Sequence, residues 1–164
     1  EGGMDDMELW NTLYSETVRR NRITAHGPEY FAPLFGNEGS NASVSLLIAE
    51  AGKKPLAAMF LSVSSDQATY LYGASSDCQR NSMAPYALQW NAIRKAKEAH
   101  CTSYDMFGVS PTADPAHPMY GLYRFKRGFG GRMLHRQGAW DYPYDQHAYT
   151  QFLGAEFSAA GFNV

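Results

Sequence analysis

Residues 67–109 decide the fold, and they read QATYLYGASSDCQRNSMAPYALQWNAIRKAKEAHCTSYDMFGV. Apolar and β-branched residues predict a strand over residues 67–73, and a second, buried strand is expected over residues 103–109. Between them, residues 81–100 carry an apolar stripe at helical spacing. A strand, a helix and a strand in succession predict a right-handed crossover between two parallel strands.

The expected central helix carries its own start signals. Asn81 or Ser82 can cap its first turn, and Pro85 lies within that turn, where a missing N–H is tolerated. Two further strand signals, at residues 43–50 and 56–64, precede the crossover. The three strands before the helix should therefore form an antiparallel meander, which makes the whole sheet mixed.

Working outward, the sequence predicts one α/β (α+β) module in which helices flank the mixed sheet. No domain boundary is apparent over residues 5–164, and residues 1–4 are set aside as an appended remnant or a disordered end. The other expected elements are helices over residues 6–20 and 29–35, a helix over 121–129, a strand over 132–140 and a helix over 145–160.

Composition limits the class of protein. The 164 residues are 45% hydrophobic and 18% charged, as in one ordinary globular domain, which excludes a long solenoid. No apolar run is long enough to predict a membrane-spanning helix. Cys78 and Cys101 lack a CxxC spacing and suggest a reducing cytoplasm, while leaving one disulfide open. The five histidines show no metal-ligand spacing, so no metal is expected.

Charge is distributed unevenly along the chain. A net charge of −2 argues against a protein that coats nucleic acid indiscriminately. Residues 80–136 nevertheless contain nine basic and three acidic residues, a local surplus of six positive charges. This surplus could meet a phosphate-bearing partner, or it could be a solvated helix face and loop.

Two stretches have a pattern that could carry chemistry. Residues 79–84 lie between a strand and a helix N-terminus and fit an acyl-CoA pyrophosphate loop, except that Ser82 stands where glycine belongs; an ordinary helix cap is the alternative. Residues 117–131 read HPMYGLYRFKRGFGG and could form a short helix, capped by Gly130 and Gly131, with its cations exposed. A second interpretation, compatible with the first because neighbouring residues on a helix face different ways, directs Lys126 into a cleft, where it could bind an anion or stabilise an oxyanion.

Four blocks carry a family resemblance in conserved order along the chain: YLYGASS (70–76), MAPYALQWNAI (83–93), YDMFGV (104–109) and GLYRFKRGFGG (121–131). They resemble the FemABX family of tRNA-dependent aminoacyltransferases, which build the interpeptide bridge of peptidoglycan. The resemblance implies a GNAT-like fold that normally occurs twice in one polypeptide. This chain would then be one module, with an N-terminal GNAT-like module as its partner.

The resemblance also implies an activity and its partners. An enzyme of this family moves an aminoacyl group from its tRNA to an amine on the stem peptide of a UDP- or lipid-linked muramyl peptide. Aminoacyl-tRNA would be the co-substrate and no cofactor is expected. The implied location is cytoplasmic, with peripheral association at the inner face of the plasma membrane. The alternatives are an acyl-CoA-dependent GNAT N-acyltransferase and a non-catalytic module of a larger enzyme.

Residue roles follow from the resemblance where the motif matches. Phe125 and Lys126 match the family's Phe-Lys pair, so Lys126 is the candidate catalytic residue. Asp105 could be a base or could pair with Arg124. The candidate substrate-binding residues are Phe125, Tyr72, Arg80, Tyr104, Asp105, Tyr123 and Arg124.

Overall fold

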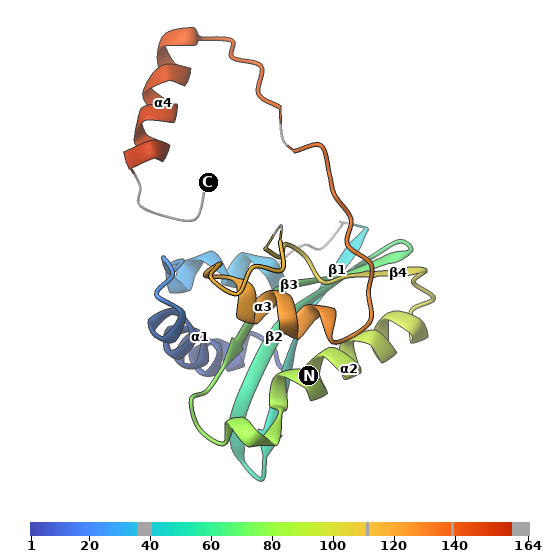
Figure 1. The fold of residues 1–164 in the computed structure, drawn as a ribbon. Coiled ribbons are helices and arrows are strands. Elements are labelled where there is room, and N and C mark those ends of the chain that lie inside the picture. The colour runs from blue at the N-terminus through green and yellow to red at the C-terminus, as the bar shows by residue number, and fades with distance from the viewer. Residues whose placement is uncertain (36–40, 111, 139, 159–164) are drawn as a thin grey trace. The chain divides into compact units, whose positions relative to one another are not determined.

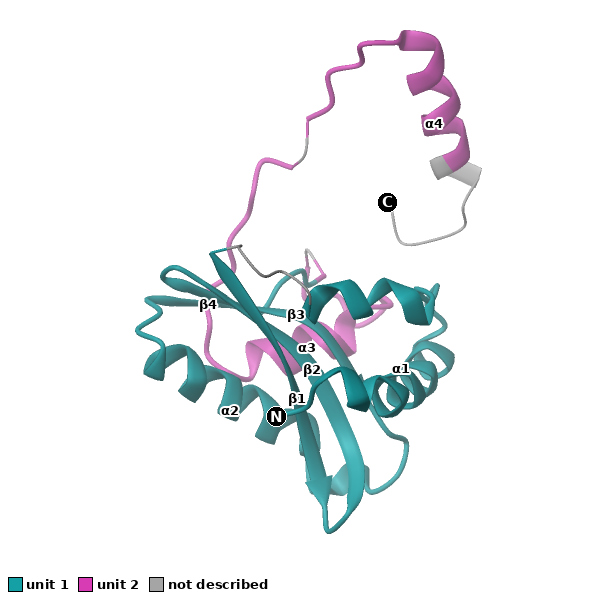
Figure 2. Cartoon of the chain, turned by 180° about the vertical axis from the view of Figure 1, so that it is seen from behind, with its two compact units in different colours: residues 1–109 teal, residues 110–164 magenta. Residues whose placement is uncertain are grey.

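The computed structural model describes residues 1–35, 41–110, 112–138 and 140–158. Its contacts divide the chain into two compact units, Glu1–Val109 and Ser110–Val164 (Figure 2). Each unit is described by itself.

The first unit is built on a mixed four-stranded sheet (Figure 1). Its strands, in spatial and chain order, are β1 (Ala42–Ala51), β2 (Lys54–Ser64), β3 (Gln67–Ser75) and β4 (Ser103–Asp105). The first three pair antiparallel, and β3 pairs parallel to β4 after a crossover through helix α2 (Ala84–Glu98). The expected meander, crossover and mixed sheet are therefore confirmed.

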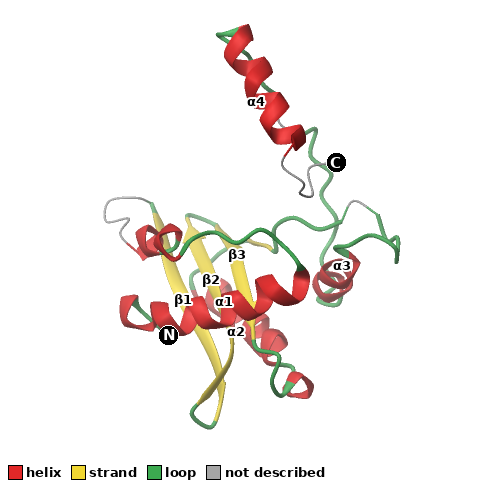
Figure 3. Cartoon of the chain, turned by 90° about the vertical axis from the view of Figure 1, so that its left-hand side faces the viewer, coloured by secondary structure: helices red, strands yellow, loops and turns green. Residues whose placement is uncertain are grey.

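Two helices cover opposite faces of this sheet (Figure 3). Helix α1 (Met7–Asn21), expected over residues 6–20, packs on one face, and α2 packs on the other. Successive side chains of β2 alternate between the two cores. Ala57 and Met59 join the core under α2, whereas Ala58 and Phe60 join the core under α1.

A β-bulge in β3 decides which side chains face which helix. Phe60 pairs with Tyr72 and Leu61 pairs with Tyr70, so Leu71 is an extra residue opposite β2. An extra residue reverses the alternation of a strand beyond it. Tyr70 accordingly packs against the core under α2, whereas Tyr72 packs against the core under α1. A Cβ at Gly73 would collide with the Tyr70 hydroxyl, so a larger residue there would require the Tyr70 side chain to move.

The expected helix over residues 29–35 is wrong. Two short 3₁₀ helices, Pro28–Tyr30 and Ala32–Phe35, occupy this stretch instead. Pro33 has no N–H to donate, and its ring disfavours the α-helical conformation of the residue before it. The stretch still contributes Phe31, which is fully buried in the core under α1.

Two expected strands are corrected. The strand expected over residues 103–109 ends at Asp105, because Phe107 adopts a left-handed φ of 64° and its N–H donates to Asp105 Oδ1 at 2.7 Å. The strand expected over residues 132–140 does not form at the described positions 132–138 and 140. A strand needs a neighbour for its backbone groups, and the described part of the second unit contains none.

The start of α2 differs from the expectation. Neither Asn81 nor Ser82 caps the helix; both lie in a 3₁₀ turn, Arg80–Ser82. The N-cap is Met83, which has a left-handed φ of 57° and makes no side-chain cap hydrogen bond. Pro85 lies in the first turn, as predicted.

The second unit contains helices α3 (Tyr120–Arg127) and α4 (Gln146–Ser158), close to the expected ranges 121–129 and 145–160. Residues 159 and 160 of the last range lie outside the described residues. Helix α3 is capped at Gly128, whose N–H donates to the Arg124 carbonyl at 3.1 Å, rather than at Gly130 and Gly131.

The first residues lie against the sheet, although the sequence analysis set them aside. The Gly2 N–H donates to the Leu46 carbonyl at 2.8 Å and forms an isolated antiparallel bridge to β1. Glu1 pairs with Lys95 at 2.6 Å. None of the helices in the described ranges is long and apolar enough to cross a membrane.

The packing under α1 predicts a large cost for truncating Phe60. Its ring meets Trp10 edge-on at 4.7 Å between centroids and is fully buried. We expect Phe60→Ala to lower the free energy of unfolding by about 3–5 kcal/mol in urea titrations, because it leaves a cavity. Phe107→Ala, at an exposed ring, is the control and should change it by less than about 0.5 kcal/mol. Equal effects of the two substitutions would contradict this packing.

Candidate functional site

The eight predicted site residues are divided between the two units. Tyr72, Arg80, Tyr104 and Asp105 belong to the first unit. Tyr123, Arg124, Phe125 and Lys126 belong to α3 of the second unit.

Tyr72 lies in an aromatic cluster on the α1 side of the sheet. Its hydroxyl is 2.8 Å from that of Tyr30, and the ring of His26 stacks on Tyr30 with centroids 4.0 Å apart. Burial, with the hydrogen bond to Tyr30, raises the pKa of Tyr72 to about 12. At neutral pH its phenol is therefore a neutral hydrogen-bonding group and cannot act as a base.

Tyr104 lies on the other side of the sheet. Its hydroxyl donates to Gln89 Oε1 at 2.6 Å, and it packs against the core under α2. Burial raises the pKa of Tyr104 well above its ordinary value. The sheet therefore separates Tyr104 from Tyr72, and the structure does not bring these two candidates together. Gln89, a buried amide that anchors Tyr104, was missed by the sequence analysis.

Arg80 lies in a 3₁₀ turn, and Asp105 is the last residue of β4. Asp105 is half-buried and accepts the Phe107 N–H described above, while Arg80 is exposed. In the loop at residues 79–83, the Ser82 N–H donates to the Gln79 carbonyl at 2.9 Å and the Met83 N–H donates to the Arg80 carbonyl at 3.3 Å. Two backbone amides that would have to bind a pyrophosphate thus already donate to carbonyls within the loop, which weakens the hypothesis that this loop binds acyl-CoA.

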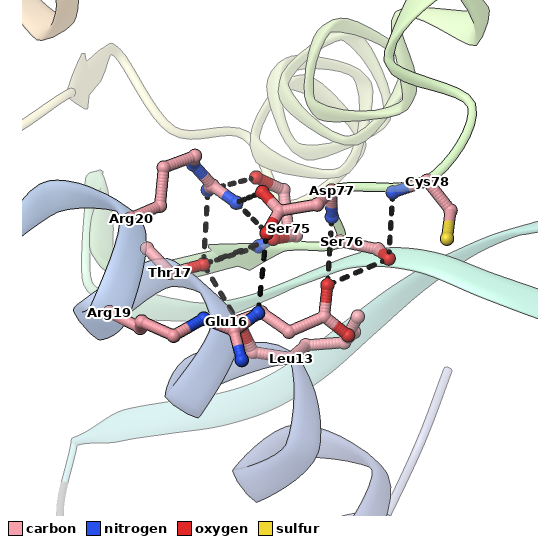
Figure 4. A network of polar contacts seen from close by, with 9 residues as sticks. All are labelled: Leu13, Glu16, Thr17, Arg19, Arg20, Ser75, Ser76, Asp77 and Cys78. Carbon is pink, nitrogen blue, oxygen red and sulfur yellow. Dashed lines mark hydrogen bonds and ion pairs between the residues drawn. The ribbon is translucent and has the colours of Figure 1, made fainter.

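A polar network joins α1 to the end of β3 (Figure 4). Arg20 donates to the Ser75 carbonyl at 3.0 Å, to Ser75 Oγ at 2.9 Å and to Asp77 Oδ1 at 2.6 Å. The Ser75 N–H donates to Thr17 Oγ1 at 2.9 Å. The hydrogen bond from Arg20 holds the pKa of Asp77 below its ordinary value. Helix α1 therefore fixes the backbone that leads from β3 toward the loop.

Glu16 extends the network to the next residues of that backbone, Ser76 to Cys78. Its carboxylate accepts the Ser76 hydroxyl at 3.0 Å and the Asp77 N–H at 2.8 Å. The Ser76 Oγ in turn accepts the Cys78 N–H at 3.1 Å. The sequence analysis missed this network, because its two halves are 55 or more residues apart and their residue types are common on any surface.

In the second unit, the three cationic side chains of α3 differ in their exposure to solvent. Arg124 and Arg127 are exposed, whereas Lys126 is 7% exposed. Phe125 meets Phe129 edge-on with centroids 5.5 Å apart, and Tyr123 stacks with Tyr120 at 6.3 Å. An ammonium group withdrawn from water interacts more strongly with a developing negative charge than an exposed one does. Burial thus marks Lys126 as different from its neighbours.

Other possible sites lie apart from these residues. An open pocket of about 370 Å³ runs along β1 and α2, and none of the eight candidates lines it. Cys78 and Cys101 are both free thiols. Within the described ranges, no three His, Cys, Asp or Glu side chains gather to hold a metal ion.

The network predicts a strong contrast between two neighbouring arginines. Arg20 has a side chain 20% exposed, whereas that of Arg19 is 75% exposed and reaches only Asp77, at 3.4 Å. We expect Arg20→Met to lower the free energy of unfolding by about 1–3 kcal/mol, because it removes charged hydrogen bonds to Ser75. Arg19→Met, measured in the same urea titration, should leave stability unchanged. An Arg20→Met protein as stable as wild type would show that the network does not hold α1 to β3.

Comparison with known proteins gives a family match over most of the chain. A model of the FemAB family matches residues 37–156. The lipid II:glycine glycyltransferase of Staphylococcus epidermidis is 32% identical to this chain over 94 residues, which are 57% of this chain and 23% of that protein. The chain thus spans less than a quarter of this relative's length.

Solved structures with this architecture confirm the expected GNAT-like fold. FemX superposes with a TM-score of 0.75 at 17% identity, over 92% of this chain and 54% of FemX. The aminoglycoside 6'-N-acetyltransferase AAC(6')-IG of Acinetobacter haemolyticus superposes with a TM-score of 0.62 at 14% identity, over 88% of this chain and 97% of that enzyme. At these identities the likeness concerns the fold alone.

Proposed function

The chain belongs to the FemAB family, and we propose on this premise that the full-length protein is an aminoacyltransferase of peptidoglycan bridge synthesis. The observation that carries the proposal is the family match over residues 37–156, which includes the Phe125-Lys126 pair. The similar glycyltransferase acts on lipid II, which supports a muramyl peptide as the acceptor.

The proposed reaction is aminolysis of an ester. The amine of the stem peptide attacks the carbonyl carbon of an aminoacyl-tRNA. A C–N bond forms, the ester C–O bond to the ribose breaks, and the proton lost by the amine ends on the ribose hydroxyl. Since the ester is already activated, aminoacyl-tRNA is the only co-substrate in this scheme and no cofactor is required.

Lys126 is assigned the role of stabilising the negative charge that develops during this attack. The tetrahedral intermediate carries an oxyanion, and a positively charged donor fixed in a water-poor site stabilises it. The burial of Lys126 in the last turn of α3 supports this role, because its exposed neighbours Arg124 and Arg127 would be screened by water. Phe125, Tyr123 and Arg124 are proposed to contact substrate on the same helix.

The four candidates of the first unit are also proposed as substrate contacts, but their positions support this role to different degrees. Arg80 is exposed and can reach a phosphate, and Asp105 lies at the end of β4. Tyr72 and Tyr104 lie on opposite sides of the sheet, so one substrate would not meet both.

The cellular setting is part of the same proposal. A lipid-linked acceptor would place the protein in the cytoplasm at the inner face of the plasma membrane, and a UDP-linked acceptor would not require that surface. The likeness to FemX over 54% of its length supports a second, N-terminal GNAT-like module in the full-length protein.

A transfer assay tests the proposed function. Full-length protein with radiolabelled glycyl-tRNA, and then with other aminoacyl-tRNAs, should label lipid II or the UDP-linked muramyl pentapeptide. The label should appear as an amide that resists mild base, because the ester of the donor does not. Labelling of an amine by acetyl-CoA, with no transfer from any aminoacyl-tRNA, would instead establish the acyl-CoA-dependent alternative.

A matched pair of substitutions tests the role of Lys126. We expect Lys126→Met to lower kcat by about 10²–10³, the usual effect of removing one oxyanion donor. Arg127→Met removes the same charge from the next position of α3 and should stay within about twofold of wild type, since Arg127 is exposed. Circular dichroism should show that both proteins remain folded at the assay temperature. Full activity of Lys126→Met would make this unit a non-catalytic module.

A further inference from the structure

The outer face of α2 carries large apolar side chains. Met83 is 49% exposed, Tyr86 39% and Trp90 62%. Spacings of three and four residues align these side chains on one side of the helix. Leu88 and Ala92, on the opposite side, are buried in the core against the sheet. Helix α2 is therefore apolar on the side that packs and again on the side that faces outward.

Basic residues continue the same outward side toward the C-terminal end of the helix. Arg94 and Lys97 follow Trp90 by four and seven residues, and both are exposed. Glu98, at the rim, lies 3.7 Å from Arg94 and offsets part of this charge. The α2 outer face, defined as Met83, Tyr86, Trp90, Arg94 and Lys97, thus has an apolar half and a basic half.

This combination fits the surface of an anionic bilayer. Trp and Tyr rings settle at the headgroup level because they have an apolar body and a polar edge. Arg and Lys beside them extend their stems along the apolar region and place their charges at lipid phosphates. A surface for RNA would need more cations and no exposed Met, and a protein partner would not require a basic half.

We propose that the α2 outer face docks on an anionic phospholipid surface, an inference that rests on the proposed function because a lipid-linked acceptor would lie there. Docking through one helix face leaves the rest of the protein in water and brings the enzyme to its acceptor by reducing a search in volume to a search in a plane. The interaction is reversible and weakens with added salt, since both cations are exposed.

Vesicle co-sedimentation of the full-length protein tests the proposal. We expect binding to vesicles of phosphatidylcholine with phosphatidylglycerol and little binding to phosphatidylcholine alone. The double substitution Arg94→Gln with Lys97→Gln should weaken binding roughly tenfold or more. Lys95→Gln is the matched control. It removes one charge from the same helix, but from a lysine paired with Glu1 at 2.6 Å and away from the outer face.

Tryptophan quenching locates the contact independently of affinity. Brominated phosphatidylcholine, mixed into the anionic vesicles, quenches only indoles that enter the headgroup region. Quenching should be lost in Trp90→Phe and retained in Trp140→Phe, which replaces an exposed tryptophan of the other unit. Both changes keep an aromatic ring at an exposed position, so folding should not be affected.

Each outcome decides for or against the docking surface. Vesicle binding that is absent, indifferent to charge or unchanged by the double substitution overturns it, and so does quenching that persists in Trp90→Phe. A Trp90→Phe variant that alters the oligomeric state instead shows that protein covers the face, and also overturns it. Transfer to the UDP-linked acceptor without vesicle binding rejects the docking surface alone, and vesicle binding without transfer to any acceptor rejects the proposed function alone.

Discussion

Burial of β2 on both faces is the constraint on which the first unit depends. Six consecutive residues, Leu56 to Leu61, are buried, and from Ala57 onward they supply alternate side chains to two separate cores. A strand of this kind is stable only when a helix covers each face, because a face left uncovered would expose apolar surface to water. Helices α1 and α2 are therefore not additions to a finished sheet. Each one completes a core that the other cannot reach.

A second asymmetry lies within one turn of α3. Lys126 is withdrawn from water while Arg124 and Arg127 remain exposed. Removing an ammonium group from water is unfavourable unless hydrogen bonds or opposite charges in the fold offset the cost. In the reaction proposed above, the same burial is what distinguishes Lys126 from its exposed neighbours as the group that meets the oxyanion.

The sequence predicted the parts of the fold that local patterns determine. The meander, the crossover and helices α1 and α2 follow from apolar periodicity and from turn residues beside each element. The strand expected over residues 132–140 failed because strand pairing depends on a distant neighbour, and the helix over 29–35 failed through Pro33. At the site, Lys126 was singled out by the family's Phe-Lys pair, and the roles of all eight candidates stay predictions. Gln89 and Arg20 could not be found, since their partners lie 15 and 55 residues away.

The extra residue in β3 has a consequence for reading related sequences. Leu71 shifts the count by one, so that Tyr70 and Tyr72, two residues apart, face different helices. An alignment that places a single-residue gap anywhere in this strand would exchange inward and outward positions for every residue after it. Two tyrosines that are chemically alike thus serve different cores, and Gly73 leaves the space that the Tyr70 hydroxyl fills.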